Sequence, residues 1–374
     1  MNEKQNTYMP LRVMISGGGT GGHIFPALAI AGALKRRNPA TEILFVGAAG
    51  RMEMERVPAA GYDIEGLPVA GFDRKRLWRN FAVVVKLMRS LVKARRLVRD
   101  FRPDIAVGVG GYASGPTLKA AQRRGVPTLL QEQNSYPGVT NKLLAKNAAA
   151  ICVAYEGLER FFPAESIVLT GNPVRASLLD CGLSQREAKE ALGFNPDAPL
   201  VFVTGGSLGA RTINESVEAA LTLWLGKGYS VLWQTGKIYA DRCVAAAAGK
   251  SGVRASAFVD DMALAYRAAD LVVARAGAST ISELQLLGKA AVLVPSPNVA
   301  EDHQRKNAEA LTERGAAVMI PDVESRAKLG ATVDRLLGEP ERLKAISAAV
   351  AAMAHPDADE AIVDRIYETV NNRK

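Results

Sequence analysis

Cysteine is scarce in this chain of 374 residues. The three cysteines, Cys152, Cys181 and Cys243, lie far apart and form neither a C-x-x-C pair nor a cluster with histidine. This usage argues against a disulfide framework and against a cysteine-based zinc site, and it is typical of a reducing cytoplasm.

Long apolar runs are absent too. No stretch approaches the ~20 consecutive apolar residues of a membrane-spanning helix, and the opening residues, MNEKQNTYMPLRVMIS, lack the basic and then apolar pattern of a signal peptide. We therefore expect a cytoplasmic protein that is not integral to a membrane.

Acidic side chains are nearly missing from one segment. Eleven lysines and arginines but a single acidic residue lie between Arg74 and Arg102, which accounts for the whole net charge of +9. Plotted as a helix from about Asn80, at about 100° per residue, the segment has two arcs. The basic arc contains Lys86, Arg89, Lys93 and Arg96, and the opposite, apolar arc contains Val84, Leu87, Met88, Leu91 and Val98.

Two interpretations of this helix remain open. A basic face beside apolar residues suits anionic lipid headgroups, with Trp78, Arg79 and Phe81 as interface anchors at its start. Alternatively, the apolar side packs on a sheet and the basic side is only solvated. Nucleic acid is disfavoured as a partner, because no nucleic-acid-binding motif accompanies the basic residues.

The rest of the chain alternates short apolar segments with helix-length amphipathic ones, which predicts an α/β fold with parallel sheets. The length favours two domains, with a linker at 170–180 where glycine and proline break the pattern. Helix candidates include 26–37, 263–269 and 301–314. The strand candidates are 13–16, 43–46, 105–109, 128–131, 151–154, 201–204, 231–234, 271–274, 292–295 and 318–320.

Glycine-rich loops follow three of these strands, at 17–22, 108–116 and 205–210, and each precedes a helix. Free N–H groups and the positive dipole end of a helix N-terminus bind phosphate, and glycine lets it approach. The first loop matches G-x-G-x-x-G, but no acidic residue ends the next strand, which argues against a nicotinamide dinucleotide. A Walker loop is unsupported, because Val244 stands at the leading glycine position before Gly249 and Lys250.

Seven motifs occur in an order that resembles the bacterial peptidoglycan N-acetylglucosaminyltransferases over nearly the whole chain. They are GGTGGHIFPALA (18–29), GVGGYASGP (108–116), EQNSYPGVTNK (132–142), TGNPVR (170–175), GGSLGAR (205–211), FVDDMALAYRAADLVVARAGASTISEL (258–284) and EDHQRKNAEAL (301–311). The resemblance implies transfer of N-acetylglucosamine, with inversion, from UDP-GlcNAc to undecaprenyl-pyrophosphoryl-MurNAc-pentapeptide (lipid I), giving lipid II. It implies no cofactor and no metal bound through an Asp-x-Asp; Asp357 and Asp359 are interpreted as solvated residues before the last helix.

The resemblance also implies a GT-B fold, in which two Rossmann-like domains face a cleft. Residues 1–172 would bind the acceptor and face the membrane, residues 173–354 would bind UDP-GlcNAc, and residues 355–374 would form a helix returning to the first domain. Such an enzyme would work at the cytoplasmic face of the membrane as a peripheral protein.

Donor contacts follow from the matched motifs. Glu283 would accept hydrogen bonds from the ribose, the backbone of Val259 would face uracil, and Gln304 and Asn134 would contact the sugar. Ser207 and Arg175 would bind the diphosphate. Further residues expected to contact UDP-GlcNAc are Thr20, Gly21, Gly22, Ala278, Ser279, Thr280, Ile281 and Ser282.

The acceptor's pyrophosphate would lie on the N-terminal loops, through Gly18, Gly19, Gly110, Gly111, Tyr112 and Ser114. Two candidates remain for the base that deprotonates the acceptor's 4-hydroxyl: His23, beside the first loop, and Glu132. The position before Glu132 is often histidine in such proteins, but here it is Gln131.

Three other functions are weighed against this one. A different UDP-sugar transferase of the same fold, acting on diacylglycerol, would not require the N-terminal pyrophosphate loops. A non-catalytic nucleotide-binding protein at the membrane surface would release no UDP when acceptor is supplied. A nicotinamide oxidoreductase would require the missing acidic residue.

Overall fold

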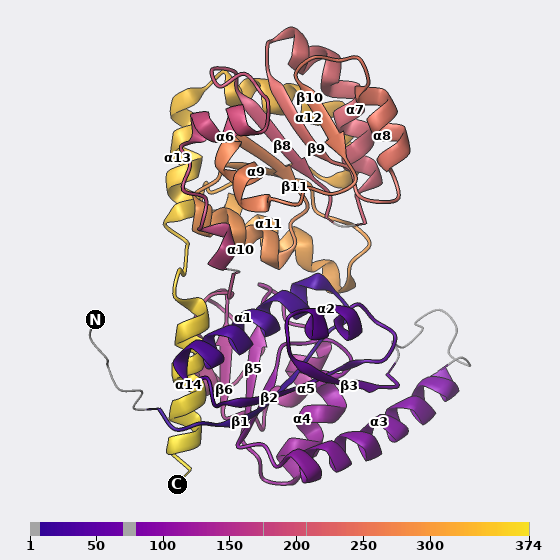
Figure 1. The fold of residues 1–374 in the computed structure, drawn as a ribbon, viewed down its shortest axis with the longest axis vertical. Helices are drawn as coiled ribbons and strands as arrows, with labels where there is room; N and C mark the ends of the chain where they lie inside the picture. Colours follow the sequence, from indigo (N-terminus) through magenta and orange to yellow (C-terminus); the bar gives the residue numbers. More distant parts are fainter. Residues whose placement is uncertain (1–7, 70–79, 175, 207, 374) are drawn as a thin grey trace. The chain divides into compact units, whose positions relative to one another are not determined.

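The computed structural model describes residues 8–69, 80–174, 176–206 and 208–373 (Figure 1). The chain forms two compact units. Unit 1 contains residues 1–175 and 355–374, and unit 2 contains residues 176–354.

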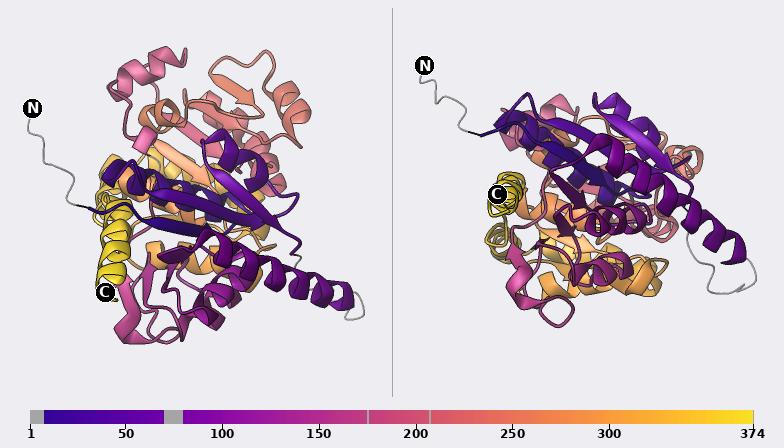
Figure 2. Two further views of the ribbon diagram at one scale, coloured as in Figure 1. Left: turned by 60° about the horizontal axis from the view of Figure 1, so that its bottom comes forward. Right: turned by 90° about the horizontal axis from the view of Figure 1, so that it is seen from below.

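Unit 1 is built on a parallel sheet of seven strands in the order β3-β2-β1-β4-β5-β6-β7, with helices on both faces (Figures 1 and 2). The strands are β1 (Arg12–Ser16), β2 (Glu42–Ala48), β3 (Asp63–Leu67), β4 (Ile105–Gly108), β5 (Thr128–Glu132), β6 (Ala150–Val153) and β7 (Ile167–Leu169). The helices are α1 (Gly21–Arg37), α2 (Glu53–Ala59), α3 (Asn80–Phe101), α4 (Ser114–Arg123), α5 (Val139–Ala145) and α14 (Ala358–Asn371).

Alternation along β1 divides the core of unit 1. Val13 and Ile15 point to one face, where α1 and α14 pack, and Met14 points to the other, where α3 and α4 pack. The last helix, α14, is tied to α1 by Arg37, which forms ion pairs with Glu360 at 2.7 Å and Asp364 at 2.6 Å.

Unit 2 repeats this plan with six parallel strands in the order β10-β9-β8-β11-β12-β13. The strands are β8 (Leu200–Thr204), β9 (Ser230–Gln234), β10 (Val253–Ser256), β11 (Leu271–Ala274), β12 (Ala291–Leu293) and β13 (Val318–Met319). The helices are α6 (Gln185–Ala191), α7 (Arg211–Gly226), α8 (Ala240–Ala247), α9 (Met262–Ala268), α10 (Ala278–Leu287), α11 (His303–Thr312), α12 (Ser325–Leu337) and α13 (Pro340–Ala351).

Both sheets therefore have the strand order of a dinucleotide-binding fold. The chain direction along the sheet reverses between β1 and β4 and again between β8 and β11, and ligands of such folds bind at the carboxyl ends of these strands. The predicted α/β class with two Rossmann-like units is confirmed, and the glycine-rich loops follow β1, β4 and β8.

Gly111 shows how tightly two of these loops pack. Its φ is +87°, and a methyl group there would lie 2.4 Å from the carbonyl oxygen of Gly18. We expect Gly111→Ala to lower the free energy of unfolding by more than about 2 kcal/mol, from backbone strain plus the clash.

A matched control is Gly157→Ala, also at positive φ (+77°) but with no heavy atom of the described residues within 4 Å. Its cost should be about 1 kcal/mol. Urea unfolding measures both, and an equal loss in the two variants would contradict the close approach.

Candidate active site

The loop after β1 rests on a buried carboxylate that the sequence pattern did not single out. Glu53, only 1% exposed, accepts hydrogen bonds from the backbone N–H of Gly19 at 3.0 and 3.1 Å and from that of Ala48 at 2.9 Å. A methyl group at Gly18 would lie 2.1 Å from Glu53 Oε1, so this glycine is required for the contact. In sequence, Glu53 differs little from its exposed neighbour Glu55.

His23 lies in the first turn of α1 and is oriented by the same loop. Its Nδ1 is 3.1 Å from the carbonyl oxygen of Gly18 and 3.2 Å from Thr20 Oγ1. A carbonyl oxygen only accepts, so Nδ1 carries the proton and Nε2 of the neutral ring is an acceptor. A methyl group at Gly110 would lie 2.9 Å from Nε2, so the second loop packs against this side of the ring.

The second loop has both of its glycines at positive φ, Gly110 at +92° and Gly111 at +87°. Tyr112 is 59% exposed, whereas Ser114 is fully buried. The Ser114 hydroxyl lies 2.7 Å from the Ser16 carbonyl oxygen and 2.9 Å from that of Gly110. The Ser114 hydroxyl thus links the loop after β1 to the loop after β4, and a contact between Ser114 and the acceptor's pyrophosphate stays a prediction.

Glu132 is buried at the end of β5, with both carboxylate oxygens occupied. Oε1 accepts from the backbone and side-chain N–H of Asn134, and Oε2 accepts from Gly138 N–H at 3.2 Å and Asn141 Nδ2 at 2.9 Å. Burial raises the pKa of this carboxyl, while the four donors favour the ionised form. This environment suits a residue that holds the 134–141 segment.

A layer of buried amides lies beside Glu132. Gln131 is fully buried, donates to Asn172 Oδ1 at 2.8 Å and accepts from the side chain of Gln133. Gln133 also donates to the Val109 carbonyl oxygen at 2.8 Å, which joins β5 to the second glycine loop.

In unit 2, α10 follows β11, next to the position where the chain direction along the sheet reverses, and Gly277 is its N-cap. Its first N–H groups have no partner within the helix, a general property of helix N-termini. Ser279 Oγ is buried without a hydrogen-bond partner among the described residues. Ile281 is fully buried and its N–H donates to the Gly277 carbonyl oxygen, and its contact with the nucleotide stays a prediction.

The remaining predicted residues of this helix are placed differently. Ala278 and Ser282 are both 7% exposed, and the Ser282 hydroxyl donates to the Ala278 carbonyl oxygen at 3.0 Å. Thr280 is half-buried. The contacts of Ala278, Thr280 and Ser282 with the nucleotide stay predictions.

Glu283, one turn further along α10, accepts a hydrogen bond from the Tyr266 hydroxyl at 2.8 Å. Tyr266 is 1% exposed and packs edge-on against Phe202 at 5.4 Å. The core of unit 2 thus orients the Glu283 carboxylate, a role for Tyr266 that the sequence pattern did not reveal.

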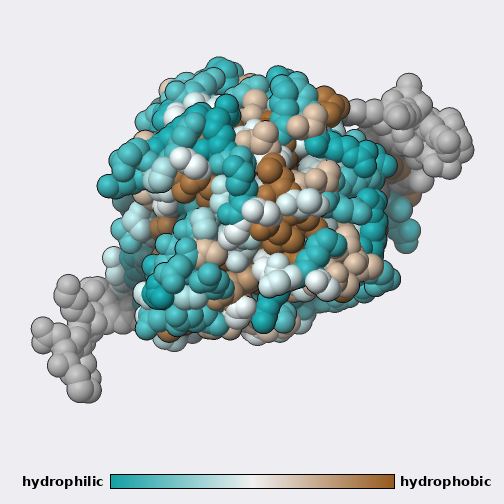
Figure 3. All heavy atoms as spheres, turned by 90° about the horizontal axis from the view of Figure 1, so that it is seen from above, coloured by the Kyte–Doolittle hydropathy of each residue, from teal (hydrophilic) through white to brown (hydrophobic). Residues whose placement is uncertain are grey.

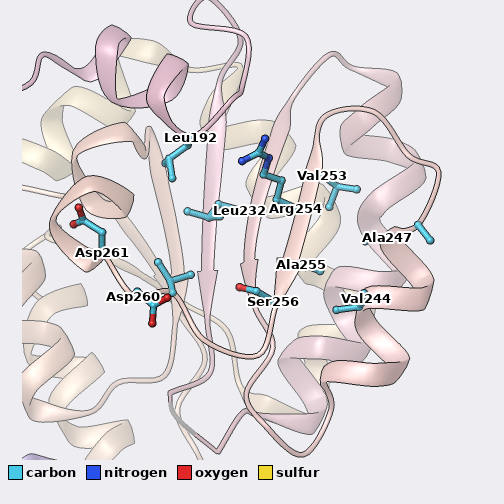
Figure 4. Close-up of a pocket in the computed structure, with 12 residues that line it drawn as sticks. Leu192, Leu232, Val244, Ala247, Val253, Arg254, Ala255, Ser256, Asp260 and Asp261 are labelled. Atoms are coloured by element: carbon cyan, nitrogen blue, oxygen red, sulfur yellow. The ribbon is translucent and has the colours of Figure 1, made fainter.

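The backbone N–H of Val259 already has a hydrogen-bond partner within unit 2. This N–H donates to Gln234 Oε1 at 3.0 Å. Val259 borders a hollow of about 570 Å³ between the β9–β10 edge and the loop carrying Asp260 and Asp261 (Figure 4). In the space-filling view, apolar residues gather near the middle of a mainly hydrophilic face (Figure 3).

Gln304 lies at the start of α11, where its Oε1 accepts from the Ser296 N–H at 2.8 Å. The two residues before this helix, Glu301 and Asp302, have φ of +57° and +53°. Consecutive non-glycine residues in the left-handed region are strained, and such strain concentrates at functional sites. No sequence pattern indicated it.

The loop after β8 packs closely against its neighbours. Gly206 and Gly209 have φ of +82°, and a methyl group at Gly209 would lie 2.2 Å from the Thr235 carbonyl oxygen.

Four of the predicted site residues lie outside the described residues. They are Ser207 and Arg175, the predicted diphosphate ligands, and Trp78 and Arg79. Phe81 belongs to the first turn of α3.

The structure corrects the two arcs of α3. Leu87, Leu91 and Val98 face inward, but Val84 and Met88 are 47% and 58% exposed. Val85 and Val92 are also exposed, as are Lys86 and Arg89. Lys93, by contrast, pairs with Glu65 at 2.7 Å and donates to the Gly66 oxygen at 3.0 Å.

Two kinds of feature are absent from the described residues. Within that part of the chain, no helix has the length and apolarity to cross a membrane, and no group of three His, Cys, Asp or Glu side chains could hold a metal ion. Asp359 lies in the first turn of α14 and pairs with Arg36.

Two relatives match the chain over nearly its whole length. One from Bacteroides fragilis is 55% identical, with 98% of each chain covered, and one from Porphyromonas gingivalis is 52% identical, covering 100% of this chain and 99% of the relative. Both are named UDP-N-acetylglucosamine--N-acetylmuramyl-(pentapeptide) pyrophosphoryl-undecaprenol N-acetylglucosamine transferase.

Among solved structures, Acinetobacter baumannii MurG superposes with a TM-score of 0.77 at 29% identity, covering 96% of this chain and 100% of that one. UDP-GlcNAc 2-epimerase from Neisseria meningitidis (TM-score 0.68, 13% identity, covering 96% and 100%) shares the fold alone.

Family models match both halves of the chain. The glycosyltransferase family 28 N-terminal domain matches residues 13–153, and the C-terminal domain of that family matches residues 200–362. The chain therefore belongs to glycosyltransferase family 28.

Proposed function

We propose that this protein transfers N-acetylglucosamine from UDP-GlcNAc to the 4-hydroxyl of MurNAc in lipid I, giving lipid II and UDP. The observation that carries the proposal is the family 28 match in both units, together with full-length relatives that bear this activity in their names. Each unit also has at least one glycine-rich loop where the strand order reverses, which suits the binding of a phosphate-bearing substrate to each unit.

His23 is the base in this proposal. With Nδ1–H bound to the Gly18 oxygen, Nε2 accepts the proton of the acceptor hydroxyl. The hydroxyl oxygen then attacks the anomeric carbon, and the bond from that carbon to the β-phosphate oxygen breaks with its electron pair going to UDP. Glu132, whose oxygens are engaged by four N–H groups, holds the 134–141 segment instead.

The donor's nucleotide is assigned to unit 2. Glu283, held by Tyr266, accepts from the ribose hydroxyls, and the Val259 carbonyl oxygen accepts from uracil. The first turn of α10, Gly206 and Gly209, and the predicted ligands Ser207 and Arg175 are assigned to the diphosphate, where donors stabilise the charge that develops on UDP.

The acceptor's pyrophosphate is assigned to the loops of unit 1. Glu53 occupies the N–H of Gly19, so the N–H groups at the start of α1, from Thr20 to Gly22, remain for an anion. The sequence motif assigns these three residues to UDP-GlcNAc, and in this proposal they lie between the two substrates and serve either diphosphate. The exposed Val84, Val85, Met88 and Val92, flanked by Lys86 and Arg89, support docking of α3 on the cytoplasmic face of the membrane as a peripheral contact.

We expect His23→Ala to lower kcat for UDP release with a short-chain lipid I analogue by about 10²–10⁴-fold, the contribution of a general base. Affinity for UDP-GlcNAc should stay within about twofold. Added imidazole should restore part of the rate, which a merely structural role would not allow.

His355→Ala, at an exposed histidine of the same unit, should keep full activity. A fully active His23→Ala would remove His23 as the base. The absence of acceptor-dependent UDP release in the unaltered protein would overturn the proposed reaction.

Removing the ribose contact should weaken donor binding. We expect Glu283→Ala to raise the Kd of UDP by about 10–100-fold, as for a charged hydrogen bond, and Tyr266→Phe to raise it less. Calorimetry with UDP and 2′,3′-dideoxy-UDP separates the contact from a general effect, because the two losses should not add. Additive losses would mean that Glu283 does not bind these hydroxyls.

Glu53→Gln tests the support of the first loop, because an amide NH₂ would replace one of the two oxygens that accept from the Gly19 N–H. We expect the KM for the acceptor to rise about tenfold and the KM for UDP-GlcNAc to stay unchanged. Glu55→Gln, on the same helix but exposed, is the control. Equal acceptor KM values for the two variants would show that the loop does not depend on Glu53.

A further inference from the structure

Unit 1 has two cations that neither the proposed reaction nor the packing of the core uses. Lys142 lies in α5, and Arg160 lies in the segment between β6 and β7. Both lie over the same ring: Lys142 Nζ is 5.5 Å from the centre of the Phe161 ring, and the guanidinium carbon of Arg160 is 4.8 Å from it. Two positive charges from different segments therefore converge on one aromatic side chain.

The surrounding residues hold this cation cluster in place. Tyr136 packs edge-on against Phe161, with 4.9 Å between the ring centres, and its own ring centre is 4.7 Å from Lys142 Nζ. Leu158 and Phe162, from the same segment as Phe161, are buried in the core. The two cations are thus positioned before a ligand binds, which lowers the entropic cost of binding.

The hydrogen-bond donors of both cations are open to a ligand. Among the described residues, neither Lys142 nor Arg160 forms an ion pair with a carboxylate. A contact with an aromatic face engages the charge of an ammonium or guanidinium group but does not use its N–H donors. Two such groups on one ring suit a carboxylate, because its oxygens accept several charge-assisted hydrogen bonds.

The cation cluster lies at the edge of the sheet that is assigned to the acceptor. β5 and β6 are parallel neighbours, so Tyr136 and Arg160 follow the same ends of the sheet as the glycine-rich loops after β1 and β4. The start of α5 also lies beside the second of these loops, since a methyl group at Gly115 would be 3.6 Å from Thr140 Cγ2. Lys142 is within one helical turn of that contact.

The acceptor of the proposed reaction brings carboxylates to this edge. Its MurNAc carries a pentapeptide, and a peptide ends in a carboxylate. Five extended residues span about 17 Å, whereas one turn of a helix is only about 5.4 Å long. A peptide on an acceptor whose pyrophosphate lies on the glycine-rich loops is therefore long enough to reach the cation cluster.

We propose that Lys142 and Arg160 bind a carboxylate of the acceptor's peptide and so select acceptors that carry one. This inference rests on the proposed function and deepens it, because it assigns recognition of the peptide to two named side chains. Tyr136 and Phe161 position the two cations. The acceptor's pyrophosphate is also an anion, so the experiment must distinguish it from the peptide.

The test uses two short-chain lipid I analogues, in solution without vesicles, that differ only in the peptide. One has free carboxylates, and in the other every carboxylate is amidated. We expect the unaltered protein to release UDP with a kcat/KM about tenfold or more higher for the free-carboxylate acceptor, mainly through a lower KM. Equal values for the two acceptors would overturn the proposal.

A double variant connects this preference to the two cations. We expect Lys142→Gln/Arg160→Gln to lose about tenfold in kcat/KM with the free-carboxylate acceptor and less than about twofold with the amidated one. Lys146→Gln/Arg123→Gln makes the same charge change at exposed positions of unit 1 and should keep the preference. Equal losses of the first variant with both acceptors would assign its cations to the pyrophosphate or to the fold and overturn the proposal.

Arg160 is exposed, so Arg160→Gln alone tests the proposal if the double variant does not fold. It should lower the preference for free carboxylates by about threefold, as for an exposed ion pair, and an unchanged preference would contradict the assignment of Arg160.

The same assay separates this proposal from the proposed reaction. If the unaltered protein releases UDP equally well with both acceptors, the peptide site alone is wrong. If it releases no UDP with either acceptor, the reaction is wrong and the peptide site is overturned with it.

Discussion

Both candidate sites depend on one constraint, the parallel pairing of β1 with β4 and of β8 with β11. Ser16 lies opposite Gly108 and Thr204 opposite Ala274, so each pair of strands ends at the same level. The following loops must then leave the sheet side by side and lead into helices whose N-termini are neighbours. Two adjacent helix N-termini form a ready anion site, and this crowding is why Gly18 and Gly111 have no room for a side chain.

Buried polar side chains hold these loops in place. Glu53 anchors the Gly19 backbone, Glu132 anchors the segment from Asn134 to Asn141, and Tyr266 orients Glu283. A buried carboxylate is costly unless its oxygens are satisfied, and here backbone and amide N–H groups satisfy them. The same bonds fix the loops before any substrate binds, which is the condition for preorganised catalysis.

The apolar runs predict the central strands well because a strand buried on both faces must be continuously hydrophobic. The strands they miss, β3, β7 and β10, are all at sheet edges, where half-exposed sequences such as DIEGL lack that run. The periodicity of the basic segment predicts the helix α3 correctly. It does not predict which face of α3 packs on the sheet, because three valines and Met88 are exposed beside the basic residues.

The site itself is predictable only where a motif marks it. Gly18, His23 and Glu283 belong to recognisable patterns, but Ser114 and Ile281 belong to the same patterns and turn inward. Glu53 and Gln234 act through contacts with residues distant in sequence. No local pattern distinguishes such a residue from an ordinary surface glutamate or glutamine, because its role arises only when the strands pair.

The return of α14 to unit 1 affects how the chain acquires its structure during synthesis. Ile362, Val363 and Ile366 fill the same core as Val13 and Ile15, although some 350 residues separate them in the sequence. Unit 2 is continuous and can fold as soon as it leaves the ribosome, whereas unit 1 keeps an open apolar face until the last helix emerges. We therefore expect the usual order, in which the N-terminal domain folds first, to be reversed, with unit 1 completed after unit 2.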